Sequence, residues 1–158
     1  MENKKIGDKL LIGRAEWIVF PELSIPAIKA KIDTGAKTSS LHALNIKTKW
    51  IHHTEIVVFD VYPLQANDQT IIHCRAPVID RRLIMSSNGS KENRYVIKTR
   101  ISLAAMTWEI EVTLSDRDPL KYRMLLGREA LKGRVLVDPS KSCHQQKFTQ
   151  KVLHKIYR

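Results

Sequence analysis

The sequence predicts an all-β domain, either a barrel or a sandwich, with no more than two short helices. Three observations predict this fold class. Short β-branched or alternating segments follow one another at nearly even spacing along most of the 158 residues. Turn-forming residues separate these segments, most clearly in the Ser-Ser-Asn-Gly-Ser stretch at residues 86–90. Only two segments place apolar residues at helical spacing.

The first half of the chain contains several strand candidates. The clearest is residues 27–32, where Ile28, Ala30 and Ile32 alternate with two lysines, as expected of a half-buried strand. A turn between Pro21 and Pro26 precedes it. The other candidates are residues 9–12 and 16–20 as two strands or one bent strand, residues 41–46 after a turn at 38–40, and residues 55–62 before a loop at 63–69.

The second half continues the strand pattern and adds the helix candidates. Strands are expected at residues 70–77, 78–85, 94–103 and 108–114, the last with Trp108, Ile110, Val112 and Leu114 on one face. Residues 127–132 are the candidate for a short helix that Gly133 ends. Residues 145–158 are the second candidate, with Phe148, Val152, Leu153 and Ile156 at helical spacing. We therefore expect a barrel domain at residues 1–140 and a basic C-terminal tail at 141–158.

Charge and composition restrict the function classes. The formal net charge of +11 favours an acidic partner, which leaves nucleic acid, an anionic membrane surface and an acidic peptide open. Lysines that only keep the surface soluble are the alternative. No apolar run approaches the roughly 18 residues of a membrane span, and Gly7, Asp8 and Lys9 interrupt any signal core, so we expect a cytoplasmic protein without membrane contact. Cys74 and Cys143 are expected to be free thiols.

An Asp-Thr-Gly sequence follows the strand candidate at 27–32. The strand delivers Asp33, Gly35 permits a tight turn after Thr34, and Ala36 leaves room for close packing. An Asp-Thr-Gly string of three residues recurs by chance, so it is weak evidence of a catalytic site on its own. The alternative is an ordinary turn in which Asp33 is capped by its own backbone. A second signal lies downstream, where an apolar segment ends in Gly127.

Together these segments resemble the retropepsin family of aspartic peptidases. The stretches AKIDTGAKTSSLHA, NGSKENRYVIKTRISL, WEIEVTLSDRD and YRMLLGREAL, followed by VLVDPS, are similar to a bacterial group labelled "ATP-dependent zinc protease" or RimK-associated (RimB-like) protease. The resemblance runs from about residue 12 to residue 140. It implies a retropepsin-like acid-protease barrel and places Asp33 in the catalytic position.

The resemblance also implies a homodimer. An aspartic peptidase activates water between two carboxylates that share one proton, because two like charges about 3 Å apart cannot both ionise. Only Asp33 lies in the strand-Asp-Thr-Gly frame; Asp80, Asp116, Asp118 and Asp138 do not. The second carboxylate is therefore expected to be Asp33 of another copy, across a two-fold axis. An inactive member and a non-catalytic dimeric adaptor remain alternatives.

Further roles follow from the resemblance alone. Thr34 is expected to tie the two turns together, and Gly35 to shape each turn. Leu125, Leu126 and Gly127 are expected to support the turn from below as core residues. Arg128 is expected to form a structural ion pair, with an exposed arginine at a helix start as the alternative.

Substrate contacts are expected from Ala36, Lys37, Asn88 and Gly89. The turn within residues 86–93 corresponds to the mobile hairpin that covers the retropepsin cleft, although a plain surface hairpin is the alternative. Residues 50–77 resemble an added hairpin. Lys37 replaces an acidic residue with which viral retropepsins bind substrate backbone. This change, the net charge and the family's association with a glutamate ligase predict acidic, glutamate-rich substrates and that ligase as a functional partner.

No cofactor is expected. The sequence lacks a phosphate-binding G-x-x-x-x-G-K-[ST] loop and the zinc patterns H-E-x-x-H and paired C-x-x-C, and its neighbouring metal-ligand types are His52–His53, His73–Cys74 and Cys143–His144. His42 is predicted to be a hydrogen-bonded barrel residue, with a contact at the cleft rim as the alternative. An RNA- or ribosome-binding module is the competing function, through the basic residues 147–158. The aromatic residues, however, are scattered singly and form no stacking platform.

Overall fold

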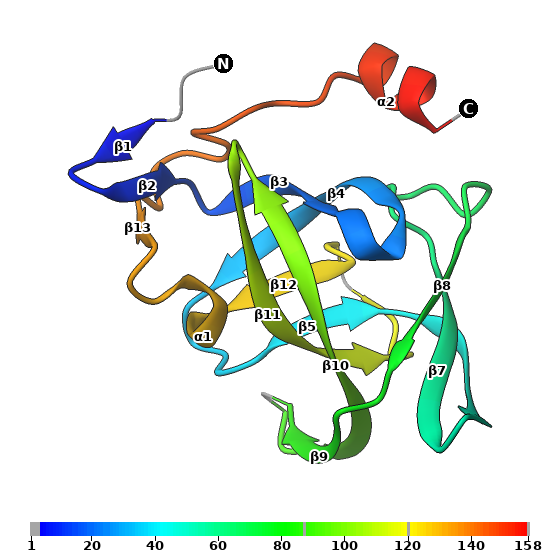
Figure 1. Cartoon of the computed structure of the whole chain (residues 1–158). Coiled ribbons are helices and arrows are strands. Elements are labelled where there is room, and N and C mark those ends of the chain that lie inside the picture. The colour runs from blue at the N-terminus through cyan, green and yellow to red at the C-terminus, as the bar shows by residue number, and fades with distance from the viewer. Residues whose placement is uncertain (1–3, 87, 120, 158) are drawn as a thin grey trace.

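A computed structural model describes residues 4–86, 88–119 and 121–157. Parts of three sequence predictions lie outside the described residues: the N-terminal residues 1–3, Ser87 in the predicted hairpin turn, and Arg158 at the end of the tail. Within the described residues the chain is dominated by strands, with one 3-10 turn and two short α-helices (Figure 1). The all-β prediction is therefore confirmed.

The elements follow one another along the chain with short connections. They are β1 (Lys5–Ile6), β2 (Lys9–Ile12), β3 (Ala15–Phe20), η1 (Pro21–Leu23), β4 (Ile25–Asp33), β5 (Ser39–His42), β6 (Leu44–Ile51), β7 (Thr54–Val61), β8 (Ile72–Pro77), β9 (Asp80–Met85), β10 (Lys91–Leu103), β11 (Met106–Ser115), β12 (Met124–Gly127), α1 (Arg128–Leu131), β13 (Val135–Val137) and α2 (Gln150–Ile156).

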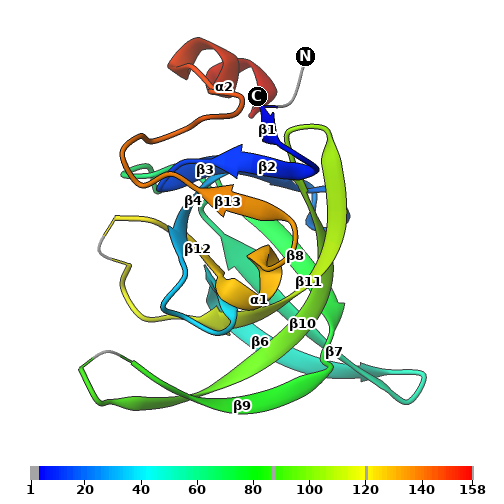
Figure 2. The same ribbon diagram turned by 90° about the vertical axis from the view of Figure 1, so that its left-hand side faces the viewer.

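Six strands close into a ring that forms the barrel. The hydrogen-bonded order is β11-β5-β12-β4-β3-β10, and the β10–β11 pairing closes it. Strand β9 pairs with the first half of β10 and extends it as a hairpin beyond the ring (Figure 2). Two smaller sheets flank the ring, β1-β2-β13 and β6-β7-β8. Closure leaves the ring strands without free edges, which is how small barrels satisfy their backbone groups.

The core lies inside the ring and follows the alternation in the sequence. Ile28, Ala30 and Ile32 of β4 are buried, as are all four predicted inward residues of β11. Leu41 of β5 and Met124 and Leu126 of β12 join the same cluster. Burying branched and aromatic side chains of this size stabilises the fold by about 1.5–3 kcal/mol each.

Two predicted boundaries are wrong. Ser39 and Ser40 belong to β5 and not to a turn, because β5 pairs with β11 on one side and with β12 on the other. The segment after Ala43 leaves the ring and forms β6. In the added region β7 and β8 form an antiparallel hairpin, which β6 extends to a three-stranded sheet. Both boundaries depend on pairing between strands that are distant in sequence. Local strand propensity does not predict this pairing.

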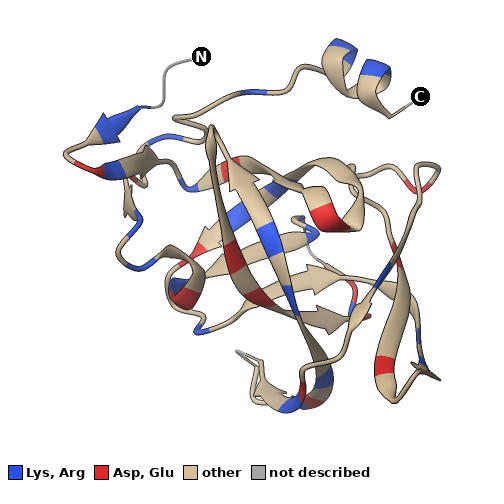
Figure 3. Cartoon of the chain, in the orientation of Figure 1, with Lys and Arg blue, Asp and Glu red and all other residues tan. Residues whose placement is uncertain are grey.

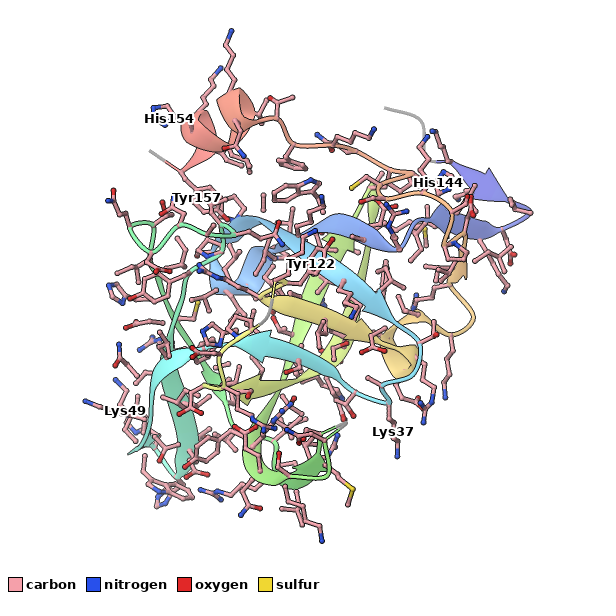
Figure 4. The ribbon with its side chains drawn as sticks, turned by 180° about the vertical axis from the view of Figure 1, so that it is seen from behind. Lys37, Lys49, Tyr122, His144, His154 and Tyr157 are labelled. Atoms are coloured by element: carbon pink, nitrogen blue, oxygen red, sulfur yellow. The ribbon has the colours of Figure 1, made fainter. Side chains whose placement is uncertain are left out.

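The predicted C-terminal helix is also shorter than expected. Helix α2 begins only at Gln150, after Thr149, whose hydroxyl accepts a hydrogen bond from the backbone N–H of Val152 at 3.2 Å. Phe148 lies before the helix and packs on Trp17, with ring centroids 5.3 Å apart. At the other end Tyr157, which lies between α2 and the barrel in Figure 4, donates a hydrogen bond to the carbonyl of Ala27. The tail is therefore docked on the barrel at both ends of α2.

Charged side chains are spread over the surface and pair across strands. Figure 3 shows basic residues on β10 beside acidic residues on β11. Lys98 and Glu109 lie 3.7 Å apart, and Arg82 of β9 reaches Glu111 at 2.7 Å. No helix in the described part of the chain is long and apolar enough to cross a bilayer. Both cysteines are buried and free, as predicted.

Candidate active site

Asp33 is the last residue of β4 and lies opposite Gly127 of β12 in the parallel β4–β12 pairing. Its side chain is half-buried, and its Oδ1 accepts a hydrogen bond from the backbone N–H of Gly35 at 3.2 Å. The backbone carbonyl of Asp33 accepts a second bond, from the N–H of Ala36 at 3.2 Å. No hydrogen bond links Asp33 to another carboxyl group within the described part of the chain.

The loop after Asp33 is held from below by β12 and α1. The backbone N–H of Arg128 donates to the carbonyl of Ala36 at 2.8 Å, and that of Glu129 donates to the carbonyl of Lys37 at 3.1 Å. The N–H of Gly127 donates to the hydroxyl of Ser39 at 3.1 Å. Because these contacts bind successive residues of the loop, they fix the position from which Asp33 projects.

Glycine is required at position 127 for steric reasons. Its backbone is extended, with φ of −84°, which any residue can adopt. A Cβ atom there would lie 2.7 Å from the carbonyl carbon of Thr38 and 2.9 Å from the carbonyl oxygen of Ala36. Both are backbone atoms of the loop after Asp33, so a side chain at 127 would displace the loop. The role of Gly127 as a support beneath the turn stays a prediction, which its replacement by alanine tests.

We expect Gly127→Ala to destabilise the protein by about 1–3 kcal/mol, the usual cost of overpacking. The matched control is Gly35→Ala, because a Cβ at Gly35 would meet only the Asp33 Oδ1, at 3.4 Å. Thermal unfolding of the two purified variants measures the difference. Equal stability of the two variants would show that the loop gives way freely and is not braced by β12.

Three predicted roles look different in the structure. Leu126 is buried, but Leu125 is half-buried on the outer face of β12, so its assignment to the core is wrong. Arg128 forms no ion pair among the described residues; its guanidinium donates to the carbonyl of Gly35 at 3.1 Å. Thr34 is exposed, and its hydroxyl makes no hydrogen bond within the described residues. Its predicted contact with a second copy stays a prediction.

The predicted cleft hairpin is formed by β9 and β10. In its turn the N–H of Ser86 donates to the carbonyl of Ser90 at 2.8 Å, and Gly89 adopts φ of +86°. Arg117 from the loop after β11 donates to the hydroxyl of Ser90 at 2.7 Å. The hairpin and that loop extend toward the same side of the barrel (Figure 2). Asn88 and Gly89 lie in this turn, between the two strands.

Two cavities lie near the Asp33 turn, although Asp33 itself lines neither of them. The first, here called the loop cavity, has a volume of about 1010 Å³ and lies between residues 35–39, β9, β11 and α1. Leu83 and Met85 of β9 line it and are 59% and 63% exposed, so the hairpin presents large apolar side chains toward the Asp33 loop. Ala36 and Lys37 line the same cavity, whereas Asn88 and Gly89 do not. Figure 4 shows Lys37 pointing outward from its loop.

The second, here called the basic cavity, has a volume of about 380 Å³ and opens beside Lys31 and Leu125. Arg94 of β10 lines both cavities. Its Nε binds Glu92 at 2.9 Å, and its Nη1 donates to the hydroxyls of Ser40 at 3.2 Å and Thr113 at 3.3 Å. The sequence reasoning missed Arg94, because its partners come from strands far away in the chain. Lys31 was detectable, since it shares the outward face of β4 with Asp33.

His42 matches its prediction as a hydrogen-bonded residue only in part. Its ring is hydrogen-bonded to the backbone at Arg117 and Ser115, but its Nδ1 is buried without a hydrogen-bond partner among the described residues. Burial, with the nearby charge of Arg123 as a smaller contribution, lowers the pKa of His42 below its ordinary value. In residues 4–86, 88–119 and 121–157, no three His, Cys, Asp or Glu side chains are placed to share a metal ion. His73 instead pairs with Asp60, and His144 pairs with Asp138 at 2.8 Å.

The lowered pKa of His42 predicts a pH dependence of stability. The unfolded chain binds a proton near pH 6.5, whereas the folded chain binds it only at lower pH. The free energy of unfolding should therefore fall as the pH drops below about 6.5. His42→Gln should remove the part of this fall that His42 causes, measured by denaturant unfolding at pH 7.5 and 5. His154→Gln, on the exposed side of α2, is the control and should keep the wild-type profile.

Comparisons with known proteins agree with this geometry. Residues 11–148 match the model of the RimB-like family, described as retropepsin-like aspartic endopeptidase RimB. A probable alpha-L-glutamate ligase of Desulfotalea psychrophila is 48% identical over 149 residues, which are 94% of this chain and 32% of the ligase. One from Shewanella pealeana is 50% identical over 135 residues, 85% of this chain and 30% of the ligase. The chain thus spans about a third of the length of these relatives.

A solved structure supports the fold independently. The crystal structure of Lpg0085, a DUF785 protein of unknown function from Legionella pneumophila, superimposes with a TM-score of 0.71 at 25% identity. The match covers 85% of this chain and 96% of that one, so the barrel and most of its flanking elements are shared. Since the family match extends over most of the residues that build the barrel and the Asp33 turn, the chain belongs to the RimB-like family of retropepsin-like aspartic endopeptidases.

Proposed function

We propose that this protein is a homodimeric aspartic peptidase in which Asp33 of each copy supplies one catalytic carboxylate. The observation that carries the proposal is Asp33 on a braced turn, with no second carboxyl group bonded to it among the described residues. Asp60 binds His73 and Asn45, Asp80 binds Arg82, and Asp138 binds His144 and Ser140. Asp116 and Asp118 have no such partner among the described residues, but they lie outside the strand-Asp-Thr-Gly frame. A two-fold axis beside the turn would bring two Asp33 side chains together.

The chemistry needs one shared proton. The ionised carboxylate of one Asp33 accepts a proton from water, and the water oxygen bonds to the carbonyl carbon of the substrate. The protonated Asp33 of the second copy donates its proton to the carbonyl oxygen. Collapse of the resulting diol breaks the carbon–nitrogen bond: the nitrogen leaves with a proton from the carboxyl group that first received one, and the second carboxylate takes a proton from a diol hydroxyl as that oxygen becomes the new carbonyl. Both carboxyl groups then return to a pair that shares one proton.

Acidic, glutamate-rich peptides are the substrates we propose. Lys37 lines the loop cavity, basic side chains line the basic cavity, and the net charge is +11. Relatives that share this sequence are named probable alpha-L-glutamate ligases, which supports a substrate made by glutamate addition and a ligase as functional partner. Attraction between such charges weakens as salt is added.

Two measurements test the proposal. Sedimentation with and without peptide should detect a dimer, if necessary only in the presence of substrate. Purified protein should cleave a glutamate-rich peptide faster than a neutral peptide of equal length, and the preference should fall between 50 mM and 500 mM salt. Equal cleavage of both peptides at all salt concentrations would exclude the acidic preference. Binding of an RNA oligonucleotide without any peptide cleavage would favour the nucleic-acid alternative instead.

A further inference from the structure

The floor of the basic cavity lies directly beside the catalytic position. In the strand register, Leu125 of β12 pairs with Lys31 of β4 on one side and with Ser40 of β5 on the other. Gly127 pairs with Asp33 two residues further along the same strands. Two residues of a strand span about 7 Å and return to the same face. The row that forms the cavity floor is therefore the next row of side chains on the face that carries Asp33.

The lining of this cavity is strongly basic. Five lysine or arginine side chains contribute to it and no aspartate or glutamate does; the five are Lys31, Arg94, Arg117, Lys121 and Arg123. Some of this charge is already compensated, because Arg94 binds Glu92 and Arg123 binds Asp68. Neither Lys31 nor Lys121 has a carboxylate partner among the described residues. The cavity thus holds positive charge that an anion would neutralise.

Size and shape favour a side-chain carboxylate over a nucleic acid. At about 380 Å³ the cavity lies at the small end of the range of ligand pockets, about 300–1,000 Å³. Among the described residues, the aromatic rings that line it are those of Tyr122 and His42, and the Tyr122 ring already lies 5.5 Å from the Lys121 ammonium. Stacking of successive bases needs several aromatic faces along a groove. A carboxylate needs only donors and positive charge, which the cavity offers.

We propose that the basic cavity is a carboxylate-binding subsite that holds the acidic side chain of a substrate residue adjoining the scissile bond. Lys31 lies two residues before Asp33 on the same face of β4, and Arg94 connects this subsite with the loop cavity. The assignment rests on the proposed peptidase function, since it takes Asp33 to mark the position of the scissile bond. It makes Lys31 a specificity-determining residue that touches substrate without taking part in proton transfer.

Matched peptides and lysine variants test the subsite. Two peptides differ only by Glu or Gln at the residues flanking the cleaved bond, and kcat/KM is measured for each. Wild type should prefer the Glu peptide, and Lys31→Gln should lower kcat/KM for that peptide by about 10- to 100-fold, because a hydrogen bond to a charged group contributes about 1.5–3 kcal/mol. The Gln peptide should be nearly unaffected. Lys29→Gln is the control, since Lys29 shares the face of Lys31 one alternation further from Asp33 and lies outside this cavity.

A binding measurement separates this inference from the peptidase mechanism. Fluorescence anisotropy with the labelled Glu peptide is recorded on Asp33→Asn protein, with and without Lys31→Gln. Weaker binding with Lys31→Gln, by at least tenfold, supports the subsite even if Asp33→Asn protein still cleaves and the aspartic mechanism fails. An unchanged preference for Glu over Gln in Lys31→Gln protein overturns the subsite, whatever the role of Asp33. Displacement of the peptide only by an RNA oligonucleotide, and not by excess unlabelled Glu peptide, also overturns it.

Discussion

Asp33→Asn should lower kcat for peptide cleavage by at least about a thousandfold while the fold remains intact. The loss is expected because general acid and base catalysis by positioned carboxylates contributes about 10²–10⁴ in rate, and an amide can replace neither role. The fold should survive because the side chain of Asp33 is half-buried and accepts one hydrogen bond, from the Gly35 N–H, which an Asn oxygen can also accept. Initial rates measure the loss of activity. Thermal unfolding and circular dichroism measure whether the fold is intact.

A mixing experiment adds the test of symmetry. If both carboxylates come from one position, equal amounts of wild-type and Asp33→Asn chains should leave about a quarter of the dimers with two Asp33 side chains. Activity should then fall to about a quarter of the value for the same total concentration of wild type. Activity at one half would show that each chain works alone and would refute the shared dyad. Asp8→Asn, in the exposed turn between β1 and β2, is the control and should retain full activity.

The barrel was predictable because local alternation and turn residues carry most of its information. The apolar positions of β4 and β11 are on the predicted faces. The short helix after Gly127 ends at Leu131 with Lys132 as its C-cap, and Gly133, with φ of +77°, follows. The closure of the ring was not predictable in detail. It depends on which strands pair, such as the parallel contact of β5 with β11, and these partners lie more than 70 residues apart.

The candidate site, like the barrel, was predictable where local sequence decides it and not where the pairing of distant strands does. The Asp-Thr-Gly motif indicated Asp33, and the glycine at the end of an apolar segment indicated Gly127. The structure places these two residues opposite each other in the β4–β12 pairing. The apolar run around Leu125 suggested a buried strand, yet strict alternation sends Leu125 to the outer face beside Lys31. The partners of Arg94 come from β5 and β11, and no local pattern in the sequence indicates them.

Glu16 is the residue where local pattern and tertiary structure conflict most. It shares a face of β3 with Ile18 and Phe20, and it is fully buried. Its Oε2 accepts hydrogen bonds from the backbone N–H groups of Gly13 at 2.8 Å and His144 at 2.7 Å, and its Oε1 accepts one from Gln145 at 3.2 Å. No lysine or arginine among the described residues forms an ion pair with it. One carboxylate thus fastens the start of the C-terminal tail to the barrel.

Glu16→Ala should therefore destabilise the protein by about 3 kcal/mol or more, because leaving a buried donor unsatisfied costs about 1–3 kcal/mol and three donors lose their acceptor. For a domain of this size the melting temperature should fall by roughly 6–12 °C. Limited trypsin digestion should also cut sooner at Lys141 and Lys147, since the tail loses its attachment. The stability of Glu16→Gln should lie between those of wild type and Glu16→Ala, because its one amide oxygen can accept hydrogen bonds from only some of the three donors.

The matched control for Glu16 is Glu22→Ala. Glu22 also binds a backbone N–H through its carboxylate, that of Arg100 at 2.8 Å, but this contact is exposed and single. Water can replace the exposed carboxylate, so Glu22→Ala should cost less than about 1 kcal/mol. If the two alanine variants unfold at the same temperature and release the tail at the same rate, the tail is held by Trp17–Phe148 packing and the Tyr157 contact, and not by Glu16. A selective loss in Glu16→Ala would instead identify a single buried carboxylate as the main link between the barrel and its C-terminal segment.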